Sequence, residues 1–201
     1  GFVLEPLQDT LFCKTEKMVH KYQARALLLV SSACAMHCRF CFRKNFPYER
    51  ERLEFTKELA YIESQKDLKE IILSGGDPLS LGDTQLKTLL EALGQIPHIE
   101  RIRFHTRFPI GIPERIDDSL LSILKQVPKQ IVWILHCNHP KELDEDVLQA
   151  LKNVQKLGIP ILNQAVLLQG VNDEEKTLLE LSEALVRGGI LPYYLHLLDR
   201  V

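Results

Sequence analysis

The feature that most constrains the fold of this chain is a regular alternation between short β-rich runs and longer amphipathic stretches. Six runs predict strands, at residues 26–30, 70–73, 99–104, 131–135, 160–167 and 190–197. Apolar residues three and four positions apart predict helices between them, at residues 56–65, 83–93, 117–125, 144–157 and 174–187. Strands that alternate with helices in this way form a parallel sheet with right-handed crossovers. We therefore expect an α/β fold, either a barrel or an open doubly wound sheet.

Residues at the ends of the predicted helices support these assignments. Short oxygen-bearing side chains accept hydrogen bonds from the free N–H groups that begin a helix. The expected N-caps are Thr56, Asp83, Asp117 and Asp144. In contrast, the first 22 residues show no clear periodicity. We interpret them as an edge segment whose packing partners lie outside this chain.

Composition narrows the class of protein. A chain of 201 residues with 45% hydrophobic residues suits one globular unit with a full core. The 25 Lys and Arg residues do not exceed the 27 Asp and Glu residues, which argues against a nucleic-acid partner. No apolar run reaches membrane-spanning length, and five cysteines make a poor disulfide framework. We expect a soluble cytoplasmic protein.

Three of the five cysteines, Cys34, Cys38 and Cys41, lie within eight residues directly after the first predicted strand. An iron–sulfur cubane held entirely by protein uses four thiolates, so three from one loop would leave one iron open to another ligand. The alternative is a structural zinc site completed by His37 or His20, although such sites usually have two separated ligand pairs. The spacing favours the cubane.

Polar residues also follow, end or lie within each later strand, and parallel α/β folds bind ligands at the carboxyl ends of their strands. The segments are 74–78 (SGGDP), 105–107 (HTR), 136–139 (HCNH), 163–164 (NQ) and 196–199 (HLLD). Segment 74–78 on its own could be a bare turn, and single histidines are often ordinary core or rim residues. His136, at the end of a strongly apolar strand, is the best candidate for ligand contact, whereas His139 before Pro140 is expected to fix a turn.

Two charged residues predict the character of the ligand. Arg43 follows the last clustered cysteine and could hold a carboxylate with two hydrogen bonds, although such residues are often simply solvated. Asp199 follows the last strand and could hold an ammonium group. Together they predict a site for an amino acid with a cationic side chain.

These residues resemble a known family, the radical S-adenosylmethionine (SAM) enzymes, through the cysteine spacing and the Gly-Gly-Asp motif after the second strand. Within that family the chain is most similar to lysine 2,3-aminomutases, of the bacterial branch that makes β-lysine for modification of elongation factor P. The matching stretches are CRFCFRKNFPY, LSGGDPLS, LNQAVLLQGVND and LPYYLHLLDRV. The resemblance extends from His20 onward.

The resemblance implies a fold, cofactors and a reaction. The fold would be a partial (β/α)6 TIM-like barrel of the radical SAM type over residues 26–201, with residues 1–25 bordering the cofactor site. The cofactors would be a [4Fe–4S] cluster, SAM and pyridoxal 5′-phosphate. The enzyme would be an isomerase that moves the α-amino group of L-lysine to the β-carbon, with a cellular electron donor and a possible homo-oligomeric state.

The resemblance also implies roles for individual residues. Cys34, Cys38 and Cys41 would ligate the cluster. The SAM contacts would be Gly75, Gly76, Asp77, His136 and Gln164. The pyridoxal phosphate contacts would be Lys21, Tyr22 and Arg25. Arg43 would bind the substrate carboxylate and Asp199 the ε-ammonium group.

The chain departs from the family pattern in its length. The family continues past the position of Val201 into a segment with the lysine that forms the internal aldimine, so no catalytic residue is assigned in this chain. We expect the 201-residue chain alone to bind the cluster and SAM without converting lysine, and detection of β-lysine would contradict that expectation. The alternatives are a related radical aminomutase that acts on another amino acid, and a non-catalytic domain stapled by zinc.

Overall fold

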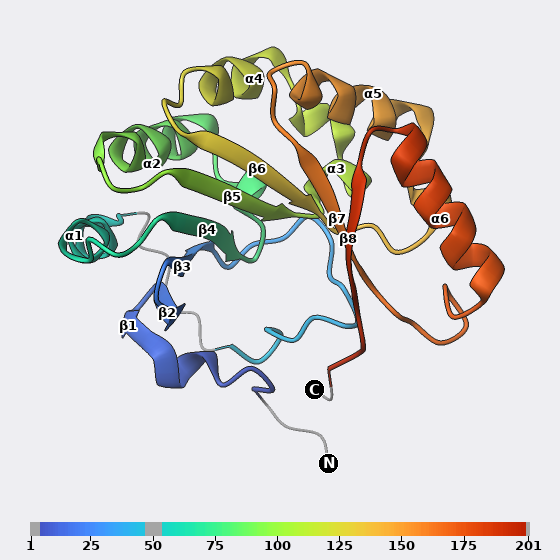
Figure 1. Cartoon of the computed structure of the whole chain (residues 1–201), viewed down its shortest axis with the longest axis horizontal. Coiled ribbons are helices and arrows are strands. Elements are labelled where there is room, and N and C mark those ends of the chain that lie inside the picture. The colour runs from blue at the N-terminus through green and yellow to red at the C-terminus, as the bar shows by residue number, and fades with distance from the viewer. Residues whose placement is uncertain (1–4, 47–53, 200–201) are drawn as a thin grey trace.

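The protein is built around one eight-stranded sheet (Figure 1), seen in a computed structural model that describes residues 5–46 and 54–199. The strands are β1 (Cys13–Thr15), β2 (Met18–Tyr22), β3 (Arg25–Ser31), β4 (Glu70–Gly75), β5 (Arg101–Thr106), β6 (Gln130–Leu135), β7 (Ile161–Val166) and β8 (Leu191–His196). They lie side by side in the order of the sequence, and β3 to β8 are all parallel. A doubly wound sheet would reverse its strand order at a switch point. The sequential order therefore confirms the partial barrel, which is not closed in the described residues.

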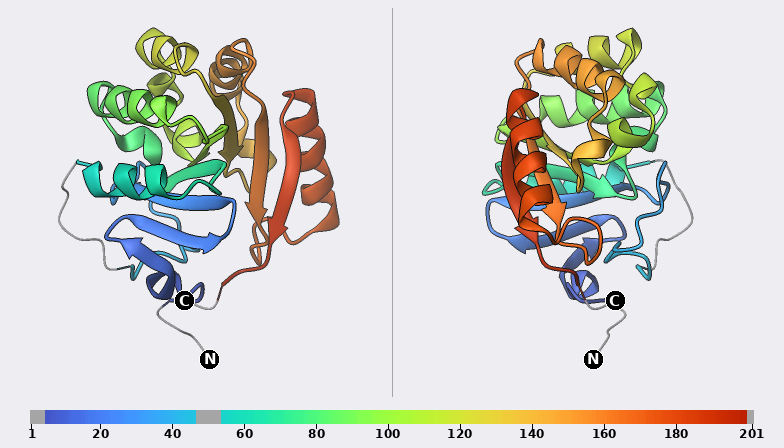
Figure 2. Two further views of the ribbon diagram at one scale, coloured as in Figure 1. Left: turned by 60° about the vertical axis from the view of Figure 1, so that its left-hand side comes forward. Right: turned by 90° about the vertical axis from the view of Figure 1, so that its right-hand side faces the viewer.

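Helices cover the outer face of the sheet (Figures 1 and 2). The α-helices are α1 (Thr56–Ser64), α2 (Asp83–Gln95), α3 (Phe108–Gly111), α4 (Asp118–Lys125), α5 (Glu145–Gln155) and α6 (Glu175–Arg187). The short 3₁₀ helices among the described residues are η1 (Asp9–Phe12), η2 (Pro78–Ser80), η3 (Pro113–Arg115) and η4 (Pro140–Glu142). The five predicted helices are thus present, whereas α3 is too short to produce a periodic pattern. Among the described residues, no helix combines the length and apolarity that a membrane crossing requires.

The two faces of the sheet differ in chemistry because alternate residues of a strand point to opposite sides. The face toward the helices is apolar and includes Leu28, Leu73, Phe104, Trp133 and Leu135, all nearly inaccessible to solvent. The register places a second set of residues together on the inner, concave face. This inner set includes Arg25, Glu70, Ser74, Arg103, His105, Gln164 and His196. The helices therefore stabilise one face, and the other is available for polar ligands.

Two of the four expected N-caps are confirmed. The Asp117 carboxylate accepts from the Leu120 N–H at 2.8 Å, and the Asp144 carboxylate accepts from the Val147 N–H at 2.9 Å. The other two assignments are wrong, because Thr56 and Asp83 already lie in the first turns of α1 and α2. Residues without a capping oxygen, Phe55 and Gly82, precede them. At the start of α2, the side-chain oxygen of Gln85 instead accepts from the Gly82 N–H at 3.3 Å.

The interpretation of the N-terminal residues as a segment packed on something outside the chain is wrong for β2. Strand β2 pairs antiparallel with β3, and β1 pairs antiparallel with β2. Met18 is fully buried and Val19 is nearly so. Arg25, the last residue of the proposed N-terminal segment, is the first residue of β3. The sheet therefore runs without interruption across the proposed boundary at residues 25 and 26.

Candidate functional site

The cysteine loop follows β3 and lies against the glycine motif at the carboxyl end of β4. The Gly76 N–H donates to the Ser31 carbonyl at 2.6 Å, and the Asp77 N–H donates to the Ala33 carbonyl at 2.8 Å. A Cβ atom on Gly76 would lie 2.1 Å from the Ala33 carbonyl oxygen. Only glycine allows this close approach of two backbones. The motif at 75–77 therefore holds the start of the cysteine loop in place.

The other two thiols of this loop contribute to the pKa of Cys34. Burial, then Asp77, then Cys41 and Cys38 raise the pKa of Cys34 to about 11. In the described ranges, no three His, Cys, Asp or Glu side chains converge on a single metal ion. The ring of His20, one of the two histidines offered for a zinc site, hydrogen-bonds the Tyr61 hydroxyl at 2.7 Å. A cubane distributes its thiolates over separate irons, so it does not need ligands that converge on one point.

The structure gives Asp77 a set of partners within the protein. Its Oδ1 accepts from the Leu79 N–H at 3.0 Å and from the Thr106 hydroxyl at 2.7 Å. Its Oδ2 accepts from the N–H groups of Arg107 and Phe108, at 2.8 and 3.1 Å. Burial raises the pKa of Asp77, opposed by these hydrogen bonds. The carboxylate therefore ties the end of β4 to the end of β5, a role that sequence reasoning missed.

Two half-buried histidines lie next to each other at the carboxyl ends of β5 and β6. The rings of His105 and His136 have centroids 5.7 Å apart and are nearly perpendicular. The Nε2 atoms of both are buried and have no hydrogen-bond partner in the part of the chain that the structure describes. Buried polar atoms normally have a partner, so each Nε2 is suited to hydrogen-bond a bound ligand. His139, in contrast, accepts from the Lys141 N–H through Nδ1 at 3.2 Å and fixes a turn, as predicted.

We expect the protein without cofactors to lose stability as the pH falls below 6.5. Burial is the largest cause of a lowered pKa in both histidines. Together with Arg107 it lowers the pKa of His136 to about 4. It lowers the pKa of His105 well below its usual value. Because the unfolded state binds these protons first, their contribution to stability is complete above pH 6.5 and is lost as the pH falls toward 4. The contribution of His136 alone should lower the free energy of unfolding by about 2 kcal/mol at pH 5 relative to neutral pH.

Urea unfolding at pH 7.5 and pH 5 measures this effect. His136→Gln should reduce the pH dependence, whereas His37→Gln should not, because His37 is exposed on the cysteine loop. A pH dependence that is the same in the wild-type protein and His136→Gln would contradict the prediction.

A second group of polar residues surrounds Asp9, which sequence reasoning did not single out. The Asp9 carboxylate is 5% exposed and lies 2.8 Å from Lys21 Nζ and 3.1 Å from both Nε and NH2 of Arg43. Arg43 NH1 also donates to the Ser74 hydroxyl at 3.2 Å. Two predicted binding residues, from β2 and from the cysteine loop, thus meet on one carboxylate. No local signal distinguishes Asp9 from other acidic residues of the chain.

The remaining predicted contacts are distributed around the inner face. Tyr22 and Arg25 are exposed at the β2–β3 hairpin, where the Arg25 guanidinium lies 5.3 Å from the Tyr22 ring centroid. Gln164 lies on β7 opposite Tyr194 of β8. Asp199 is half-buried just after β8. The structure brings Lys21 and Arg43 together, and leaves the hairpin at the opposite end of β3 from the cysteines.

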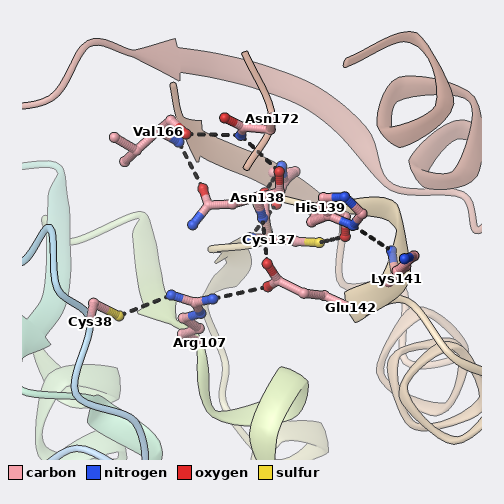
Figure 3. Close-up of polar contacts among 10 residues, drawn as sticks. Cys38, Arg107, Cys137, Asn138, His139, Lys141, Glu142, Val166 and Asn172 are labelled. Carbon is pink, nitrogen blue, oxygen red and sulfur yellow. Dashed lines mark hydrogen bonds and ion pairs between the residues drawn. The ribbon is translucent and has the colours of Figure 1, made fainter. Parts of the chain in front are cut away.

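A third polar network connects the cysteine loop to the ends of β6 and β7 (Figure 3). Arg107 lies between Cys38 and Glu142, and Glu142 accepts from the Asn138 N–H at 3.3 Å. Asn172 is fully buried and donates to the Asn138 carbonyl at 2.8 Å. The sequence placed Arg107 and Asn138 in strand-end motifs but assigned them no role. Glu142 and Asn172 were missed altogether, because only the fold brings them there.

Comparison with known proteins identifies related sequences. L-lysine 2,3-aminomutase of Escherichia coli (strain K12) is 44% identical to this chain, and that of Haemophilus influenzae is 41% identical. Both alignments cover 100% of this chain, but only 59% and 60% of those proteins. The chain thus spans less than two thirds of the length of these curated relatives.

Solved structures show the same fold. Native anSMEcpe with bound AdoMet superposes with a TM-score of 0.62 at 14% identity, over 87% of this chain and 50% of that one. TsrM from Kitasatospora setae, with cobalamin and a [4Fe-4S] cluster bound, gives a TM-score of 0.58 at 15% identity, over 87% of this chain and 36% of that one. At such identities the likeness concerns the fold alone. Residues 28–182 match the family described as the radical SAM superfamily. The chain therefore belongs to the radical SAM superfamily.

Proposed function

We propose that this chain forms the cluster- and SAM-binding barrel of a lysine 2,3-aminomutase, which converts L-lysine to β-lysine for the modification of elongation factor P. The observation that carries the proposal is the convergence, at one edge of the sheet, of the three-cysteine loop and two imidazoles whose buried Nε2 atoms have no partner among the described residues. The aminomutases that align with the whole of this chain support it.

The residues present fit a cluster and SAM. Cys34, Cys38 and Cys41 would hold a [4Fe–4S] cluster, since a cubane is ligated by thiolates. SAM would lie beside them, against residues 75–77 and Gln164, with His136 Nε2 free to hydrogen-bond it. When bound, these groups supply one-electron chemistry, while the protein positions the substrate and excludes water.

The β2–β3 hairpin suits a phosphate group. Lys21 and Arg25 are cations from adjacent strands, and cationic side chains are the usual partners of phosphate. We propose that, with Tyr22, they contact pyridoxal 5′-phosphate. Lys21 would do so close to Arg43, because both side chains already contact Asp9.

Two charged residues support lysine as the substrate. Arg43 contacts the carboxylate of Asp9, which supports a role for its guanidinium in pairing with the carboxylate of an amino acid. Asp199 would attract the ε-ammonium group of lysine and would repel an acidic side chain. A related aminomutase that acts on another amino acid is the second candidate. A cellular electron donor, a homo-oligomeric state and a cytoplasmic location, where the thiols stay reduced, belong to the same proposal.

We expect Cys38→Ser to abolish the iron centre. The wild-type protein, reconstituted without oxygen, should contain about four irons and cleave SAM when reduced. Cys38→Ser should lose most of the iron. Cys13→Ser is the matched control, since Cys13 lies on β1 outside the cysteine loop, and should retain it. Stoichiometric zinc in place of iron would contradict the proposal.

The substrate is tested separately. With SAM, a reductant and pyridoxal phosphate, the whole enzyme whose barrel this chain is proposed to form should convert L-lysine to β-lysine, detected by mass spectrometry, and should leave glutamate unchanged, whereas the 201-residue chain alone should not convert lysine. Omission of pyridoxal phosphate should prevent the reaction. Conversion of another amino acid but not of lysine would favour the second candidate.

A further inference from the structure

Arg107 lies at the junction of the polar groups around the cysteine loop. It directly follows β5, and its backbone N–H donates to the buried Asp77 carboxylate at 2.8 Å. Its guanidinium lies 5.4 Å from the centroid of the Phe40 ring, within the cysteine loop. The Asp77 carboxylate therefore holds the backbone of Arg107, independently of the polar contacts of the Arg107 side chain.

The Arg107 guanidinium bridges a cysteine and a carboxylate (Figure 3). NH1 donates to Cys38 Sγ at 3.1 Å, and NH2 donates to Glu142 Oε2 at 3.1 Å. Burial disfavours the cation, but attraction to Glu142 and Cys38 outweighs burial and raises the pKa of Arg107. Arginine also stays protonated at any physiological pH. The sulfur of Cys38 thus receives a hydrogen bond from a permanent positive charge.

Glu142 is itself held from the other side. Its Oε1 accepts from the Asn138 N–H at 3.3 Å. Asn138 Oδ1 accepts from the Val166 N–H at 2.8 Å, and the Asn138 carbonyl accepts from Asn172 Nδ2 at 2.8 Å. These bonds fix Glu142 to the carboxyl ends of β6 and β7. The guanidinium is therefore held by the barrel through Glu142, in addition to its contacts with the cysteine loop.

We propose that Arg107 is a positioning residue that holds the Cys38 sulfur and raises the reduction potential of the iron–sulfur cluster, with Glu142 limiting the increase. The inference rests on the proposed function, because it concerns the cluster that Cys38 would ligate. Reduction adds one negative charge to the cluster, so a cationic donor at a ligand sulfur stabilises the reduced form more than the oxidised form. Hydrogen bonds to sulfur and net charge are established determinants of such potentials.

The test is a redox titration of the reconstituted full protein, followed by the EPR signal of the reduced cluster. Arg107→Gln should lower the ratio of reduced to oxidised cluster about tenfold at the wild-type midpoint, which corresponds to 59 mV for a one-electron couple. Glu142→Gln should shift the potential the opposite way, because it removes the opposing negative charge. Arg187→Gln is the matched control: Arg187 is exposed on α6 and pairs only with Glu183 among the ion pairs of the described residues.

The outcomes separate this inference from the proposed function. Shifts of opposite sign in Arg107→Gln and Glu142→Gln support the inference, and a merely structural role would not reverse sign. If both variants bind the cluster with the wild-type reduction potential, the inference is overturned and the proposed function remains intact. If Arg107→Gln does not assemble a cluster, the shift in Glu142→Gln and a smaller decrease in Arg107→Lys decide the question. A wild-type protein that binds no iron overturns both proposals.

Discussion

Gly76→Ala should displace the cysteine loop and abolish iron binding. The added methyl group would lie 2.1 Å from the carbonyl oxygen and 2.7 Å from the carbonyl carbon of Ala33, and neither is a flexible side chain that can turn away. The two backbones must separate to relieve this steric clash. The separation breaks the hydrogen bonds from the Gly76 N–H to Ser31 and from the Asp77 N–H to Ala33. Overpacking of this kind costs about 3 kcal/mol or more when backbone has to move. Urea unfolding and the iron content after reconstitution measure the two effects.

Gly82→Ala is the matched control for this substitution. A Cβ on Gly82 would meet only the Gln85 side-chain oxygen, at an ordinary 3.6 Å. Because Gly82 precedes α2, alanine there should cost less than about 1 kcal/mol, through a weaker N-cap. A Gly76→Ala protein with wild-type stability and iron content would show that the close approach to Ala33 is not required.

Asp77→Asn should destabilise the protein nearly as much as Asp77→Ala. Every partner of the carboxylate donates a hydrogen bond, so the NH2 group of an asparagine would face donors on whichever side it lies. Each buried donor left without an acceptor costs about 1–3 kcal/mol. We therefore expect both substitutions to lower the free energy of unfolding by roughly 4 kcal/mol. Urea unfolding without cofactors measures this loss.

Asp117→Asn provides the comparison for the same change of side chain. Asp117 caps α4 through one accepted hydrogen bond, and asparagine caps a helix about as well as aspartate. The free energy of unfolding of the Asp117→Asn protein should differ from that of the wild-type protein by less than about 0.5 kcal/mol. If Asp77→Asn is equally stable but binds SAM weakly, the predicted role of Asp77 as a ligand contact is correct and the structural role is not the main one.

The parallel part of the fold could be predicted because its signals are local. Runs such as 131–135, and helical stretches such as 144–157, carry their periodicity in consecutive residues. The β1–β2 hairpin was missed because its strands are short. The burial of Met18 depends on pairing with β3, which no local pattern indicates.

The residues of the candidate site likewise fall into those with a local sequence signal and those without one. The roles of the cysteines, Gly76 and His136 could be predicted from the sequence, because thiolate ligation and close backbone approach depend on residue types at fixed positions. Asp9 and Glu142 could not. Their importance depends on which cations they meet: Arg43 lies 34 residues from Asp9 in the chain, and Arg107 lies 35 residues from Glu142.

The order of residues was enough to establish a sheet of six parallel strands with a thiol-rich loop after the first of them, since both follow from patterns over neighbouring positions. Only the tertiary structure determined how the charged residues pair. Asp77 accepts hydrogen bonds from backbone N–H groups, and Asp9 lies between Lys21 and Arg43. Arg107 lies between Cys38 and Glu142. The physical reason is that hydrogen bonds and ion pairs act over a few ångströms in space. Their partners are therefore determined by which strand ends the barrel brings together.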